Sequence, residues 1–248
     1  MSSPSIRIKY IVPYPLGEDG VARRAAQVPS DILSPGTAVE LVPVASSYDH
    51  TVPGAGDSFF ESFQMERGSI ECGATAEDEG FDAVVMDTVS DSGLRALRSR
   101  LTIPVVGPGQ TAYWIASALG VRFGVLTYTD GHSYLYETLL RTYGLSDRLA
   151  GVRAAGSEAD LDNLVTAGDT EKVARFVEAA RRLVDTDGAH VIVLGSTTLH
   201  AVRSAVEAGT GVPVINPGPT ALKLAESLVQ LGLSHSKAAY PSPPAASS

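Results

Sequence analysis

The chain contains one stretch twice, and this internal repeat constrains the fold more than any other feature of the sequence. Residues 80–109 read GFDAVVMDTVSDSGLRALRSRLTIPVVGPG, and residues 188–218 read GAHVIVLGSTTLHAVRSAVEAGTGVPVINPG. Each copy has an apolar run of strand length, a hydroxyl residue at its end, an amphipathic helical segment, a second apolar run and a Pro-Gly turn. Two strand–helix–strand units of this kind predict an α/β fold with two similar halves.

Similarity outside the repeat extends this division to most of the chain. Residues 6–15 (IRIKYIVPYP) and 121–130 (VRFGVLTYTD) both read as a strand that ends in a tyrosine-containing loop. We therefore predict two pseudo-symmetric lobes, each a mainly parallel sheet flanked by helices, with a cleft between them. Residues 1–108 plus 217–233 are predicted to form the first lobe and 109–216 the second. The Pro/Ser/Ala-rich residues 234–248 are predicted to be a disordered tail.

Composition excludes several classes of function. The 248 residues are 44% hydrophobic and 19% charged, as in an ordinary globular protein, and the net charge of −9 argues against nucleic acid or an anionic membrane as partner. The single cysteine, Cys72, forms neither an internal disulfide nor a cysteine metal cluster. The N-terminus lacks an apolar signal core, and no run approaches membrane-spanning length. We expect a cytoplasmic protein that forms a homo-oligomer.

The candidate site consists of polar residues at the ends of the predicted strands. Thr88 and Ser196 occupy equivalent positions in the two copies, at the carboxyl ends of strands, where open parallel sheets bind their ligands. Either the two hydroxyls face each other across one cleft, or they cap the helices that follow. The unpaired N–H groups at such helix starts could also hold a carboxylate or an oxyanion.

Other residues near these strand ends could move a proton or bind a ligand. Asp87 could act as an acid or base or orient a hydroxyl, Asp91 could complement a helix dipole, and His200 follows Ser196 by one helical turn. Further residues complete the set: Tyr14, Ser90, Tyr128, Thr129 and Thr197 as substrate-binding groups, Asp130 with His132 as a second acid–base pair, and His50 as a lone loop histidine. No phosphate-binding loop, dinucleotide loop or metal-ligand spacing is found in the sequence, so we predict no cofactor and no metal.

At these residues the chain resembles the aspartate/glutamate/hydantoin racemase superfamily, nearest to its hydantoin racemase and arylmalonate decarboxylase branches. The matching motifs are GFDAVVMDT with DSGL, IPVVGPGQTA, VRFGVLTYT, and GAHVIVLGS followed by VPVIN, and they cover nearly the whole chain. The resemblance implies two α/β lobes, an inter-lobe cleft and no cofactor. It also implies chemistry by two cysteines, one in each lobe, which remove and return the α-proton of the substrate.

Both cysteines are replaced here, because the matching positions hold Thr88 and Ser196, and Cys72 matches neither. A thiol with a pKa of about 8.5 can be tuned into the working range, whereas an alcohol is a far weaker acid and needs a separate base. Two-cysteine racemisation of aspartate, glutamate or simple 5-substituted hydantoins is therefore not expected.

We expect a cofactor-independent isomerase or lyase that acts on a small carboxylate or a cyclic amide or imide. Its enolate-like intermediate would be held by Thr88, Ser196 and nearby N–H groups. One alternative is a hydrolase with Ser196 as nucleophile, and another is a non-catalytic homologue that binds a small molecule.

Overall fold

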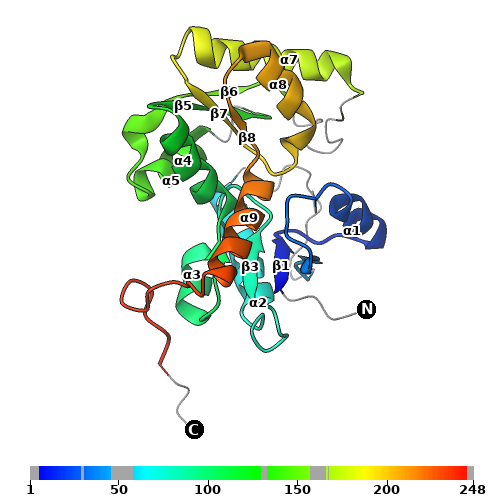
Figure 1. Ribbon diagram of the computed structural model, residues 1–248, viewed down its shortest axis with the longest axis vertical. Coiled ribbons are helices and arrows are strands. Elements are labelled where there is room, and N and C mark those ends of the chain that lie inside the picture. The colour runs from blue at the N-terminus through cyan, green and yellow to red at the C-terminus, as the bar shows by residue number, and fades with distance from the viewer. Residues whose placement is uncertain are drawn as a thin grey trace.

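The computed structural model of the protein describes residues 6–28, 31–45, 58–129, 133–156, 166 and 168–244, which form two α/β lobes, one above the other in Figure 1. The first sheet contains β1 (Ile6–Val12), β2 (Thr37–Pro43), β3 (Ala83–Met86) and β4 (Val105–Val106) in the order β2-β1-β3-β4. The second contains β5 (Phe123–Thr127), β6 (Leu149–Ala154), β7 (Val191–Leu194) and β8 (Val214–Ile215) in the order β6-β5-β7-β8. All pairings are parallel, so the predicted fold class is confirmed.

Each sheet is covered on both faces, which explains why its central strands are continuous apolar runs. All four residues of β3 and all four of β7 are buried. Along β1 the faces alternate: Ile11 packs with Val84 in one apolar cluster, and Tyr10 packs with Val85 in another. The same strand order and the same burial in both lobes follow from the two apolar runs of the repeat.

Helices connect the strands within each lobe. The first lobe has α1 (Glu18–Ala25), α2 (Phe59–Gly73) and α3 (Leu94–Arg100), and the second has α5 (Ser133–Thr142), α7 (Thr170–Asp185) and α8 (Arg203–Thr210). The short 3-10 helices η2 (Ser146–Arg148) and η3 (Leu199–Val202) precede β6 and α8. None of the described helices is long and apolar enough to cross a membrane.

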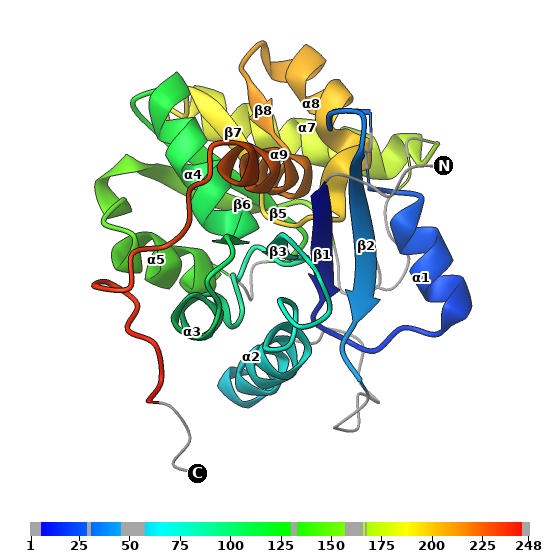
Figure 2. The same ribbon diagram turned by 60° about the horizontal axis from the view of Figure 1, so that its bottom comes forward.

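Two further helices carry the chain between the lobes. α4 (Pro108–Leu119) packs against β5 and β7, and α9 (Pro217–Gln230) returns to the first sheet, where it contacts β1, β3 and β4. The two helices also contact each other, and they lie side by side in Figure 2. Both begin at a proline, because the first helical position needs no N–H and suits the fixed φ of proline.

Residues 234–244 are ordered against the first lobe, which differs from the predicted disordered tail. Within this segment we call residues 234–241 the C-terminal strap. Lys237 Nζ donates to the carbonyls of Arg98, Ser99 and Leu101 at 2.9, 3.0 and 2.6 Å, and so satisfies backbone groups at the end of α3. His235 Nε2 accepts a hydrogen bond from the Val105 N–H at 2.7 Å. Composition alone does not reveal such pairings of side chains with distant backbone groups.

Ser69 in α2 provides a test of the packing in the first lobe. Its side chain is fully buried, and within the described part of the chain its hydroxyl has no hydrogen-bond partner. Ser69→Ala should therefore raise the free energy of unfolding by about 1 kcal/mol, because an unsatisfied buried hydroxyl is removed. Urea denaturation measures the change. Ser227→Ala is the control, because the Ser227 hydroxyl donates to the Lys223 carbonyl and is therefore satisfied. A loss of stability in Ser69→Ala would contradict the assignment of the Ser69 hydroxyl as buried and unsatisfied.

Candidate active site

The loops that follow β3 and β7 contain the same small hydrogen-bonded turn. In the first, Thr88 Oγ1 lies 2.8 Å from Ser90 Oγ and accepts from the Ser90 N–H at 3.3 Å. In the second, Ser196 Oγ lies 2.8 Å from Thr198 Oγ1 and accepts from the Thr198 N–H at 3.2 Å. We call residues 88–90 and 196–198 the first and second hydroxyl turns. Because the two turns have matching geometry, Thr88 and Ser196 are equivalent in the structure as well as in the repeat.

The first hydroxyl turn does not open a helix, whereas the second leads directly into the 3-10 helix η3, with Thr198 at the N-cap position but without a capping hydrogen bond from its side chain. After the first turn, Asp91 takes a left-handed φ of 54° and Gly93 one of 81°, and α3 begins only at Leu94. After the second turn the 3-10 helix η3 intervenes, and α8 begins at Arg203. A hydroxyl that binds the N–H two residues on competes with helix formation, which is the physical reason why neither turn opens an α-helix.

Asp91 caps a helix, but the helix is α4 rather than the one that follows it in sequence. Its carboxylate accepts from the N–H groups of Gly109 and Gln110 at 2.9 and 2.8 Å, and from the hydroxyl of Tyr143 in the second lobe at 2.6 Å. A Cβ on Gly107 would lie 2.5 Å from the Asp91 carboxyl carbon, so only glycine allows this approach. Burial raises the pKa of Asp91 to about 6, against the three hydrogen bonds, which lower it.

Asp87 is held by a buried arginine that the sequence did not single out. Arg24 of α1 donates from Nε to Asp87 Oδ2 at 2.6 Å and from Nη2 to Oδ1 at 2.5 Å, and the Tyr10 hydroxyl donates to Oδ1 at 2.6 Å. The side chains of Arg24 and Asp87 are 7% and 0% exposed. Both carboxylate oxygens thus face a buried cation, in a geometry that fixes the orientation of the carboxylate.

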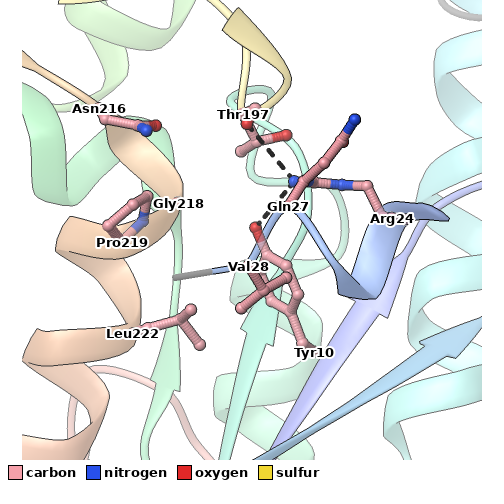
Figure 3. A pocket seen from close by; sticks show the side chains of 9 residues that line it. All are labelled: Tyr10, Arg24, Gln27, Val28, Thr197, Asn216, Gly218, Pro219 and Leu222. Carbon is pink, nitrogen blue, oxygen red and sulfur yellow. Dashed lines mark hydrogen bonds between the residues drawn. The ribbon is translucent and has the colours of Figure 1, made fainter. Parts of the chain in front are cut away.

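The ion pair also contacts the second lobe. Arg24 Nη2 lies 3.4 Å from the Thr197 carbonyl, and Thr197 Oγ1 donates to the Asp87 carbonyl at 3.3 Å. Figure 3 shows the Arg24 guanidinium between Tyr10 and Thr197. The residue before Thr88 thus touches the residue after Ser196. The structure therefore brings the loops of both lobes together, and the facing of their two hydroxyls across one substrate stays a prediction.

A small pocket lies beside this contact. Residues in and just after α1, in and just before α9, and in the second hydroxyl turn line it together with Tyr10: Arg24, Gln27, Val28, Thr197, Asn216, Gly218, Pro219 and Leu222 (Figure 3). It has room for about one water molecule. Asn216 Oδ1 is buried and has no hydrogen-bond partner within the described residues. In this conformation the pocket could therefore hold a hydrogen-bonded water but not a cyclic amide.

His200 lies next to the ion pair with one ring nitrogen unsatisfied. It is half-buried in η3, and no described residue forms a hydrogen bond with its buried Nδ1. Burial lowers the pKa of His200, the charge of Arg24 lowers it further, and Asp87 opposes both. The lowered pKa favours the neutral imidazole at pH 7, and the role of His200 in proton transfer stays a prediction.

Of the predicted ligand-binding tyrosines, Tyr128 contacts the second hydroxyl turn and Tyr14 lies near the ion pair. Tyr128 is buried against Phe176, with ring centroids 5.8 Å apart, and its hydroxyl lies 3.3 Å from Thr198 Oγ1. Burial raises the pKa of the Tyr14 hydroxyl, and the negative charge of Asp87 raises it further, which places Tyr14 near the ion pair. Because Tyr128 is only 1% exposed, it supports the second turn from behind rather than lining an open cleft.

The remaining sequence candidates divide into described and undescribed residues. Thr129 is half-buried just after β5. His50, Asp130 and His132 lie outside the described residues. Among the described residues, no group of three or more His, Cys, Asp or Glu side chains could hold a metal ion.

The sequence matches a model of a known protein family. The Asp/Glu/Hydantoin racemase model matches residues 47–225. The hydantoin racemase of Pseudomonas sp. (strain NS671) is 31% identical over 186 residues, which are 75% of this chain and 73% of that protein.

Solved structures show the same fold. The crystal structure of allantoin racemase from Pseudomonas fluorescens superposes with a TM-score of 0.82 at 29% identity, over 98% of this chain and 99% of that one. Arylmalonate decarboxylase superposes with a TM-score of 0.61 at 21% identity over 90% of this chain and 92% of that one, which shows a shared fold.

Proposed function

The chain belongs to the Asp/Glu/hydantoin racemase family, and on that premise we propose that it is a cofactor-independent isomerase or lyase acting at the α-carbon of a cyclic amide or small carboxylate. One observation carries the proposal: the loops with the two matching hydroxyl turns meet through the contacts of Arg24 and Asp87 with Thr197, and a histidine with an unpartnered buried nitrogen follows the second turn. The names of the hydantoin and allantoin racemase relatives favour the cyclic amide.

The proposed chemistry assigns one role to each group. The His200 imidazole takes the α-proton, and the electron pair of the broken C–H bond moves into the adjacent carbonyl to form an enolate. The hydroxyls of Thr88 and Ser196 donate to the developing enolate oxygen, where fixed donors in a buried site have their largest effect. In a lyase, loss of CO₂ from a substrate carboxylate would form the same enolate. His200 would first have taken up a proton from water and, as the imidazolium, would deliver it to the α-carbon.

A single base limits the stereochemistry. Inversion needs a base on each face of the α-carbon, and Asp87 is bound on both oxygens by Arg24. With His200 as the base, the proton returns to the face from which it left. Exchange of the α-proton should therefore exceed racemisation, in line with the expected lack of racemase activity.

The test is to incubate the protein in D₂O with enantiopure 5-benzylhydantoin, aspartate or glutamate, or with a prochiral 2-aryl-2-methylmalonate. NMR follows the α-proton and CO₂ loss, and chiral chromatography follows inversion. We expect exchange with retained configuration or decarboxylation to one enantiomer. Racemisation as fast as exchange would refute the single-base assignment. A ring-opened product with an acyl group on Ser196 would show a hydrolase, and tight binding without reaction would show a non-catalytic binder.

The pH dependence follows from the lowered pKa of His200. A base acts when deprotonated, so kcat/KM should rise with pH through a midpoint below the ordinary value of 6.5 and be level at neutral pH. The rising limb should disappear in His200→Ala and persist in His190→Ala, because His190 is an exposed histidine whose Nδ1 accepts from the Val121 N–H. An unchanged limb in His200→Ala would assign the titration to another group.

A further inference from the structure

Arg24 and Asp87 form an ion pair at the junction of the lobes. The arginine comes from α1 and the aspartate from the end of β3, 63 residues apart in the sequence. Two parallel donor groups of the guanidinium meet both oxygens of the carboxylate, a geometry that fixes orientation as well as distance. Tyr10 adds a third hydrogen bond to the same carboxylate.

Both members of the pair reach the second hydroxyl turn. Arg24 contacts the carbonyl of Thr197, and the carbonyl of Asp87 accepts from the hydroxyl of Thr197. Thr197 is the central residue of the second turn, and Asp87 directly precedes the first turn. The guanidinium, the carboxylate residue and Thr197 thus form a closed ring of contacts that spans the two lobes.

Burial of this pair is not explained by stability alone. Two charges removed from water gain little net stability over apolar residues of the same size, whereas such pairs can fix one arrangement among several. The arrangement fixed here is the spacing of the two hydroxyl turns. We infer that Arg24 is a positioning residue, which holds the turns of the two lobes in register through Asp87 and Thr197. The inference rests on the proposed function only for what the turns do.

A second arginine–aspartate pair in the chain supplies a matched control. Arg153 donates from Nε and Nη2 to the two oxygens of Asp187, both at 2.7 Å. This pair joins β6 to the loop before β7, entirely within the second lobe. It has the same bidentate geometry as the Arg24–Asp87 pair but does not connect the two lobes.

Hydrogen–deuterium exchange measured by mass spectrometry tests the inference without any substrate. In Arg24→Met, exchange at residues 195–199 should rise about tenfold more than exchange in β5 and β7, although the substitution is in the first lobe. Arg153→Met should leave 195–199 unchanged. If Arg24→Met does not fold, Arg24→Lys is the alternative, because lysine keeps the positive charge and loses the two parallel donors of the guanidinium. It should show a smaller increase in exchange rate at residues 195–199. An increase confined to α1 and the first lobe in either Arg24 variant would overturn the inference.

Kinetics add an independent readout. With any compound that the wild-type protein converts, Arg24→Lys should lower kcat more than it raises KM, because misplaced turns harm the transition state more than the bound substrate. A change in KM alone would contradict positioning. If the wild-type protein converts none of the compounds, the proposed function fails, and the exchange measurements still decide the role of Arg24.

Discussion

Arg24→Met should lower the free energy of unfolding by about 3–5 kcal/mol, the largest effect on stability that we expect from a single substitution in this chain. The substitution removes the cation and leaves the Asp87 carboxylate buried, where its side chain is 0% exposed. Tyr10 alone would then compensate the charge with one hydrogen bond. Urea denaturation followed by circular dichroism measures the loss.

The paired variant separates the ion pair from the packing around it. Arg24→Met combined with Asp87→Leu removes both charges and should recover most of the lost stability, because an apolar pair can replace a buried ion pair at little net loss. Arg153→Met should cost less than Arg24→Met, since its partly exposed side chain leaves Asp187 more accessible to water. If the double variant is as unstable as Arg24→Met, the loss comes from the shape of the site rather than from an unpaired charge.

Thr88→Val and Ser196→Ala should each lower kcat/KM by about 10²–10³-fold while the fold is retained. Each substitution removes one hydroxyl that is proposed to donate to the enolate oxygen and leaves a side chain of similar size. The effect equals about 2.7–4 kcal/mol of transition-state stabilisation, the scale measured for one donor in an oxyanion hole. Steady-state kinetics on the compound found in the D₂O experiment gives the value.

Matched controls remove hydroxyls of the same kind outside the site. Thr142 and Ser117 donate to backbone carbonyls within α5 and α4, so Thr142→Val and Ser117→Ala should leave kcat/KM unchanged. Full activity in Thr88→Val would remove Thr88 from the proposed site. A loss in Ser196→Ala together with full activity in Thr88→Val would favour Ser196 as a nucleophile, and thus the hydrolase.

The sequence predicted the architecture because the repeat encodes it locally. The apolar runs that became β3 and β7 are short, continuous and followed by hydroxyl residues in both copies. Runs of this kind fit strands covered on both faces, and the connections between them are long enough for helices. The equivalence of Thr88 and Ser196 was visible for the same reason.

The contacts around the site were less predictable because they join residues far apart in the chain. Arg24 follows Arg23 on a short charged helix, a pattern typical of a solvated surface, and only its packing against Asp87 shows otherwise. Capping of the following helices was one of the two interpretations of the hydroxyl residues, and in the structure their side chains bind their own turns. The sequence is compatible with both a helix cap and a local turn at Ser and Thr residues, and tertiary packing decides which of the two forms.

The C-terminal strap has a consequence for how copies of this protein can meet. β4 is an edge strand of the first sheet, and such edges are templates for β-augmentation by another chain. Here the N–H of Val105 is bound by His235, and its carbonyl is bound by Arg98 at 3.0 Å. In the second sheet, Arg203 binds the carbonyl of Val214 in β8 at the same distance. Side chains thus occupy the backbone groups with which a ladder would continue from β4, so copies of this protein would not associate by extending the first sheet from this strand.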